Sequence, residues 1–154
     1  MIELAQDFQD LLIELADADA EFVVVGGYAV AFHGHVRATK DLDVFVRATR
    51  ENAEKVYRAL AEFGAPLEHF DVTVGDFSGY GGVLQIGLPP RRIDIISKVS
   101  GITFEDAIDD KRSFELDGRR IPVIGLEALV KNKTAAGRAQ DLADVESLEK
   151  ARKT

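Results

Sequence analysis

One segment near the N-terminus constrains the fold more than any other part of the sequence. It opens with an apolar run, Phe22–Val25, that is typical of a buried strand. Two glycines, Gly26 and Gly27, separate this run from a short helix-compatible piece, Tyr28–Phe32. A second apolar run follows at Asp41–Val46. The sequence therefore predicts a strand, a tight glycine turn, a short helix and a second strand in close succession.

The second strand of this segment carries two carboxylates, Asp41 and Asp43. Because side chains alternate between the two faces of a strand, both carboxylates point to one face, whereas Leu42 and Val44 point into a core. Neighbouring carboxylates raise each other's pKa unless a cation lies between them. Oxygen ligands alone suit magnesium or manganese. The pair is therefore a candidate metal site.

The glycine turn adds a second kind of chemistry. Without Cβ atoms, Gly26 and Gly27 let an anion approach the backbone N–H groups at the start of the following helix. The partial positive charge of a helix N-terminus favours phosphate. A phosphate site beside a metal site suggests metal-dependent chemistry on a nucleoside triphosphate.

These motifs, in this order, resemble the signature of the nucleotidyltransferase superfamily, which has the DNA polymerase beta-like fold. The resemblance implies a third carboxylate on a neighbouring strand, and Asp94 in the run Arg91–Ile96 is the matching candidate. It implies an α/β (α+β) fold, with a mixed twisted sheet of about five strands flanked by helices. It also implies that Asp41, Asp43 and Asp94 are the catalytic residues and hold two Mg²⁺ or Mn²⁺ ions.

A finer resemblance rests on Arg37, Thr39 and Lys40, which precede the carboxylate pair. These residues look like those of the minimal nucleotidyltransferases related to AbiEii-type toxins. That resemblance implies an RNA end as the acceptor, a role in a toxin–antitoxin system and a cognate antitoxin as a partner. Lys40 is then expected to bind the nucleotide together with Gly26 and Gly27.

The C-terminal run from Lys131 to Asp144 resembles a motif of the same group: a lysine, then Gly-Arg, then Asp-x-x-Asp. The resemblance implies that Lys133 and Arg138 hold the triphosphate and that Asp141 orients them. Two cations at this place make chemical sense, because they neutralise the leaving pyrophosphate.

The remaining elements follow from periodicity and capping signals. Helices are expected over residues 3–18, 50–63 and 104–109 and from Gly125 onward, and strands over residues 83–88, 92–96, 113–116 and 120–123. Residues 64–82 are expected to form a loop with one short element. In the last helix, Leu142, Val145 and Leu148 are expected to face inward, with Asp141 and Asp144 elsewhere.

Length and composition set further bounds. The 154 residues fit one nucleotidyltransferase domain over residues 1–154. The net charge of −8 argues against a non-specific nucleic-acid binder, although it leaves an RNA substrate open. The chain has no cysteine and no apolar run near the roughly 20 residues that span a membrane. Its acidic, amphipathic N-terminus is unlike a signal peptide, so a cytoplasmic location without a membrane partner is expected.

The implied enzyme moves a nucleoside monophosphate from a nucleoside triphosphate to an acceptor hydroxyl. The resemblance leaves the acceptor open between an RNA end, a protein side chain and a small antibiotic. The alternative function is a non-catalytic module of the same fold that binds a nucleotide or a partner protein. An interaction protein such as an antitoxin subunit is a second alternative.

Overall fold

The computed structural model describes residues 4–35, 39–79, 82–87 and 91–153. Within these residues, six strands form one mixed sheet, one more than the number expected. The strands are β1 (Phe22–Val25), β2 (Asp41–Val46), β3 (Val83–Ile86), β4 (Arg92–Ile96), β5 (Arg112–Leu116) and β6 (Arg119–Val123). Their order in the sheet is β3-β4-β2-β1-β6-β5. The expected mixed α/β class is confirmed.

The two strands of the glycine segment lie at the centre of this sheet. β2 pairs antiparallel with β1 and parallel with β4, and β1 also pairs in parallel with β6. β3 and β5 pair antiparallel with β4 and β6 at the two edges. The expected hairpin between β5 and β6 turns at Asp117 and Gly118, whose φ angles are 48° and 78°. Two positive φ angles are typical of the tight hairpin turn that Asp-Gly favours.

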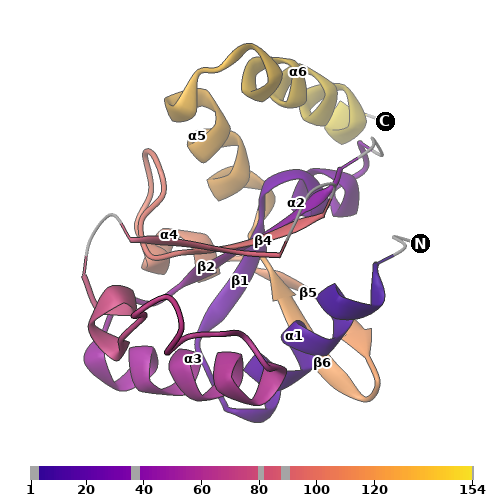
Figure 1. Ribbon diagram of the computed structural model, residues 1–154. Helices are drawn as coiled ribbons and strands as arrows, with labels where there is room; N and C mark the ends of the chain where they lie inside the picture. Colours follow the sequence, from indigo (N-terminus) through magenta and orange to yellow (C-terminus); the bar gives the residue numbers. More distant parts are fainter. Residues whose placement is uncertain (1–3, 36–38, 80–81, 88–90, 154) are drawn as a thin grey trace.

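Helices cover both faces of the sheet (Figure 1). The helices are α1 (Gln6–Asp17), α2 (Gly26–Phe32), α3 (Arg50–Phe63), α4 (Phe104–Ile108), α5 (Leu126–Ala136) and α6 (Ala139–Lys153), with a 3₁₀ turn, η1 (Val74–Phe77). In Figure 1, α1 and α3 lie on one side of the sheet, whereas α5 and α6 lie on the other. None of the described helices is both long and apolar enough to cross a membrane.

Helix α1 packs its apolar stripe into the hydrophobic core. Its apolar stripe, Phe8, Leu11, Leu12 and Leu15, is fully buried, as the helical spacing predicts. Phe8 meets Tyr28 of α2 edge to face, with ring centroids 5.8 Å apart. Burial of such side chains contributes about 1.5–3 kcal/mol each, so this stripe fixes α1 to the sheet.

Local capping signals set the helix ends as expected. Thr49 caps α3 by accepting a hydrogen bond from the backbone N–H of Asn52, 3.2 Å away. α3 ends at Gly64, which has a φ of 96°. Thr103 and Asp106 form the expected capping box at the start of α4.

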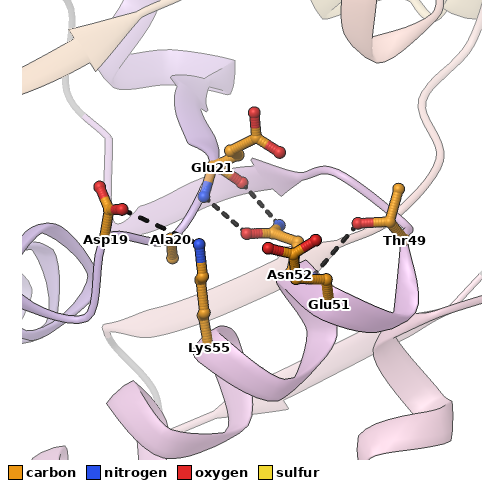
Figure 2. Close-up of a pocket in the computed structure, with 7 residues that line it drawn as sticks. All are labelled: Asp19, Ala20, Glu21, Thr49, Glu51, Asn52 and Lys55. Carbon is orange, nitrogen blue, oxygen red and sulfur yellow. Dashed lines mark hydrogen bonds and ion pairs between the residues drawn. The ribbon is translucent and has the colours of Figure 1, made fainter.

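A polar cavity of about 390 Å³ lies at the start of α3, beside the end of β1 away from the glycines. Figure 2 shows Asn52 bonded to the backbone of Glu21, whose N–H donates to the Asn52 amide over 2.7 Å and whose carbonyl accepts from it over 2.9 Å. The Asn52 amide also donates to the carbonyl of Arg47, 2.9 Å away. These bonds use both amide hydrogens of Asn52 and its oxygen, so Asn52 ties α3 to the sheet.

The last helix follows its expected orientation only in part. Leu148 is buried as expected and Val145 is half-buried, but Leu142, also expected inward, is 51% exposed, while Asp141 and Asp144 are buried. The cause is Lys133 of α5, which forms ion pairs with both carboxylates. The orientation of α6 is therefore set by buried charge as well as by its apolar residues.

Candidate active site

The three predicted catalytic carboxylates lie on one face of neighbouring strands. Asp43 of β2 and Asp94 of β4 are register partners, and Asp41 is the partner of Arg92. Register partners on adjacent strands project to the same face, so Arg92 joins the carboxylates there. The spacing of two between Arg92 and Asp94 predicts this shared face, on which an Arg–Asp ion pair is the alternative to a metal ligand, and the structure contains that pair.

These residues line a cavity of about 850 Å³ between the sheet and the α5–α6 pair. The glycine turn, Lys40 and the carboxylates line one part of it. Lys133, Arg138 and Asp141 line another. This volume falls within the range of about 300–1,000 Å³ that is usual for small-ligand pockets. The fold thus brings the predicted site residues from four separate segments into one cavity.

Gly26 is required by its contact with Asp43. Its φ is +67°, and a Cβ built on Gly26 would lie 2.1 Å from Oδ2 of Asp43. Val25, the residue before it, is the register partner of Asp43, which explains the close approach. Phosphate binding by this glycine stays a prediction, whereas its contact with Asp43 shows that it makes room for a carboxylate.

Asp43 carries a strongly perturbed carboxyl group. Burial raises its pKa to about 7, and the charge of Asp94, a hydrogen bond with Asp94 and the charge of Asp41 act in the same direction. The charge of Lys133 opposes this rise but does not cancel it. Asp43 is therefore held in a place where its negative charge is unfavourable, first because it is buried and then because Asp94 and Asp41 lie beside it.

Arg92 supplies positive charge to the other two carboxylates. Its Nε donates to Oδ1 of Asp94 over 3.0 Å, and its Nη2 donates to Oδ2 of Asp41 over 3.3 Å. The bond with Asp94 is the main reason that the pKa of Arg92 is raised. The guanidinium thus links β4 to β2 across the candidate metal site.

The donor types fit a divalent cation, but Arg92 already bonds to two of the three carboxylates. Three carboxylates on one sheet face are the oxygen donors that Mg²⁺ and Mn²⁺ prefer, and burial together with the charges of Asp94 and Asp41 makes the ionised form of Asp43 unfavourable without a cation. Across the described residues, no three His, Cys, Asp or Glu side chains stand close enough together to hold a metal ion. A metal at Asp41 and Asp94 therefore requires the Arg92 guanidinium to move.

Lys133 belongs to a buried ion cluster. Its Nζ lies 3.1 Å from Oδ1 of Asp141 and 3.2 Å from Oδ2 of Asp144. All three side chains are buried. Gln140 also donates to Oδ1 of Asp144 over 2.9 Å. The predicted phosphate-binding lysine is therefore already paired with two carboxylates at the cavity wall.

Arg138 reaches the same cluster from the exposed side. Its Nε donates to Oδ2 of Asp141 over 2.6 Å, and its Nη2 donates to Oδ1 over 3.2 Å. Burial alone would raise the pKa of Asp141, but hydrogen bonds from Arg138 and Lys133 hold that pKa below its usual value. Asp141 thus contacts both cations at once, while the binding of a triphosphate by them stays a prediction.

Thr39 and Lys40, two of the residues that resemble the AbiEii-like group, lie near the carboxylates. Thr39 donates from its hydroxyl to the carbonyl of Asp41, 3.3 Å away. Lys40 is exposed at the cavity edge. Arg37 lies outside the described residues.

The sequence as a whole matches a known family. Residues 5–154 match the family described as a nucleotidyl transferase of unknown function, DUF2204. The chain belongs to this nucleotidyl transferase family. The predicted superfamily is therefore confirmed, whereas the match does not name the AbiEii-like group, which stays a prediction. None of the curated proteins matches the sequence significantly.

Solved structures show the same fold. LnuA, a lincosamide antibiotic adenylyltransferase solved with lincomycin bound, is 17% identical, with a TM-score of 0.57 and coverage of 95% of this chain and 96% of its own. TM1012 from Thermotoga maritima, assigned as a nucleotidyltransferase, is 18% identical, with a TM-score of 0.54 and coverage of 98% and 94%. A nucleotidyltransferase-like antigen from Paracoccidioides brasiliensis is 14% identical, with a TM-score of 0.52 and coverage of 94% and 77%.

Proposed function

We propose that this chain transfers a nucleoside monophosphate from a nucleoside triphosphate to an acceptor hydroxyl and releases pyrophosphate. One observation carries the proposal: Asp41, Asp43 and Asp94 line the same cavity as the glycine turn and the cation Arg138. Carboxylates suit metal-assisted phosphoryl chemistry, and a cation beside them suits the phosphates. Membership of a nucleotidyl transferase family supports the same reaction.

In this proposal, Asp41, Asp43 and Asp94 would hold two Mg²⁺ or Mn²⁺ ions. The bound metal neutralises charge on the phosphates and lowers the pKa of the attacking hydroxyl. Asp94, which is buried, accepts the proton of that hydroxyl at its carboxylate.

The remaining residues position the nucleotide. Gly27 lies in the cavity wall, where its lack of a Cβ lets a phosphate approach the backbone. Arg138 presents an exposed guanidinium that Asp141 orients, and it neutralises the leaving pyrophosphate. Lys133 contributes indirectly, because its contacts with Asp141 and Asp144 hold α6 in place. Lys40 at the cavity edge meets the outer part of the nucleotide.

The acceptor divides into classes that an experiment can separate. An RNA end would accompany a toxin–antitoxin role, and a protein hydroxyl would be a second macromolecular acceptor. The lincomycin-bound LnuA structure supports a small antibiotic as the acceptor for a chain of similar fold and length. The net charge of −8 also disfavours a polyanionic acceptor such as RNA.

The test is a labelling assay with each α-³²P-labelled triphosphate and Mg²⁺, offered total RNA, cell lysate or lincomycin in parallel. We expect label to enter one acceptor class with the wild type and none with Asp43→Asn, a variant that keeps the size of the side chain. Label that enters equally with both proteins contradicts the proposed site. Nucleotide binding without transfer to any acceptor supports the binding module instead.

A further inference from the structure

We propose that Arg92 is the resident counter-cation of the acidic cluster and that a divalent metal binds there by displacing its guanidinium. The acidic cluster is Asp41, Asp43 and Asp94. The inference rests on the proposed function, because it takes these carboxylates as metal ligands. It goes further by assigning Arg92 a role in setting the affinity for the metal.

The contacts of Arg92 show why the two cations exclude each other. Arg92 donates to Oδ1 and Oδ2 of Asp94 over 3.0 and 3.4 Å and to Oδ2 of Asp41 over 3.3 Å. These oxygens are the lone-pair donors that a metal would need. A guanidinium and a divalent ion that share them would also repel each other. Occupation by one therefore requires release of the other.

The surroundings of Arg92 allow that release. Its side chain is 38% exposed, whereas that of Asp94 is only 12% exposed. The backbone of Arg92 is fixed in β4, but its side chain is long and flexible. Asp94 is held in a buried position, whereas Asp41, whose side chain is 39% exposed, has room to adjust when Arg92 leaves. The guanidinium can therefore move into solvent while Asp94 stays in place.

The structure also indicates why a divalent metal would bind the cluster more strongly than the Arg92 guanidinium does. The hydrogen bonds of Arg92 to the cluster go to Asp41 and Asp94, and none of those in the described part of the chain goes to Asp43. Arg92 is thus shared between two of the three carboxylates, and Asp43 is acted on by the charges of Lys133 and Arg138. A divalent ion brings twice the charge in a smaller volume. Without metal, Arg92 reduces the repulsion among the three carboxylates but does not neutralise all of their negative charge.

The experiment measures Mn²⁺ binding to the purified protein by electron paramagnetic resonance, in the absence of nucleotide. Arg92→Gln removes the competing charge with a similar side-chain size. We expect it to bind Mn²⁺ at least about tenfold more tightly than the wild type, because charge-assisted hydrogen bonds no longer have to be broken. Arg92→Lys keeps the positive charge but lacks the planar guanidinium, and we expect about a threefold gain in Mn²⁺ affinity.

Arg91→Gln is the matched control for net charge. Arg91 is the exposed residue immediately before β4, and it is not among the described residues that line the cavity. The same charge change at this position tests for long-range electrostatics alone. For Arg91→Gln we expect a gain in Mn²⁺ affinity of no more than about twofold, because solvent and salt screen exposed charges at a distance. Equal gains for Arg91→Gln and Arg92→Gln overturn the inference.

Thermal unfolding with and without saturating Mn²⁺ gives a readout that does not depend on activity. Without metal, Arg92→Gln is expected to unfold at a lower temperature than the wild type, because the carboxylates lose their counter-cation. With Mn²⁺, this gap is expected to close. A gap that persists with metal overturns the inference, since Arg92 then has only a structural role.

The outcomes separate this inference from the proposed function. Asp43→Asn is expected to abolish Mn²⁺ binding at the cluster. If the wild type binds Mn²⁺, Asp43→Asn does not, and Arg92→Gln shows no gain, the inference fails alone. If neither the wild type nor Arg92→Gln binds Mn²⁺, both the inference and the metal-dependent function fail. Should Arg92→Gln not fold, the threefold gain expected for Arg92→Lys decides the question.

Discussion

Asp43 and Asp94 are register partners on the parallel strands β2 and β4, so two carboxylates stand side by side on one sheet face. Burial, together with the neighbouring charge of Asp94, raises the pKa of Asp43 to about 7. Ionisation of both carboxylates therefore destabilises the metal-free fold near neutral pH. A site that disfavours its own fold in this way is typical of a functional site.

The first prediction concerns pH and stability without metal. Unfolded Asp43 has a pKa of 3.8 and folded Asp43 one of about 7, so between these values the folded state binds more protons. The contribution of Asp43 to the free energy of unfolding therefore falls as pH rises through this window, by a few kcal/mol, and is level above it. Asp43→Asn is expected to be more stable than the wild type at pH 8 and similar at pH 4.

Urea denaturation at both pH values in EDTA measures this difference. Added Mn²⁺ at pH 8 is expected to stabilise the wild type and not Asp43→Asn, because the metal replaces the proton as the compensating charge. A wild type that is as stable as the variant at pH 8 without metal contradicts the raised pKa.

The second prediction concerns the glycine turn. Gly26→Ala places a methyl group against the Asp43 carboxylate at a φ of +67°. We expect a loss of about 2–5 kcal/mol in the free energy of unfolding, from backbone strain and overpacking together. Gly118→Ala is the matched control, because its φ is +78° and a Cβ there would meet nothing within 4 Å. Equal losses in the two variants, measured by urea denaturation, would show that the contact with Asp43 adds nothing.

The third prediction concerns the buried lysine. Lys133→Met removes the ammonium from Asp141 and Asp144 and leaves buried negative charge behind. Such a change costs about 3–5 kcal/mol of stability. The double variant Lys133→Met/Asp144→Asn is expected to recover part of this loss, since a neutral amide needs no counter-charge. Chemical denaturation at pH 7 provides both values.

Lys150→Met serves as the control for the third prediction. Lys150 pairs with Glu146 on the exposed side of α6, over 3.4 Å. Exposed pairs contribute at most about 1 kcal/mol, so little change is expected. If Lys133→Met is as mild as this control, the ion cluster does not anchor α6.

The fourth prediction separates nucleotide binding from stability. The side chain of Arg138 is 77% exposed, and its partner Asp141 keeps Lys133 when Arg138 is replaced. Arg138→Gln is therefore expected to raise the KM for the nucleoside triphosphate about tenfold, with less than about 1 kcal/mol lost in stability. Steady-state kinetics and a thermal melt check the two parts.

Arg152→Gln is the matched variant for Arg138→Gln. Arg152 also lies on α6 and pairs with Glu127, 2.7 Å away, but it is not among the described residues lining the cavity. No change in KM is expected for Arg152→Gln. A similar rise in both variants would mean that net charge, not position, governs nucleotide affinity.

Local patterns in the sequence were sufficient for most of the elements. The apolar run at β1, the cap at Thr49 and the Asp117-Gly118 turn each predict structure, because their signals act over a few neighbouring residues. The spacing of Asp41 and Asp43 likewise predicts a shared face from strand geometry alone. The approach of Asp94 to Asp43 followed from a resemblance, and the register of β2 with β4 confirms that the two are neighbours.

The sequence by itself determined the family, the strands and the residue types of the site. Only the tertiary structure decided that Leu142 faces solvent and that Arg92 crosses from β4 to Asp41. Both outcomes depend on which charges meet across separate elements: Lys133 draws the acidic side of α6 inward, and the acidic cluster draws in Arg92. Helical and strand periodicity report how one element divides its own faces, but Coulomb attraction between elements depends on a packing that no single segment encodes.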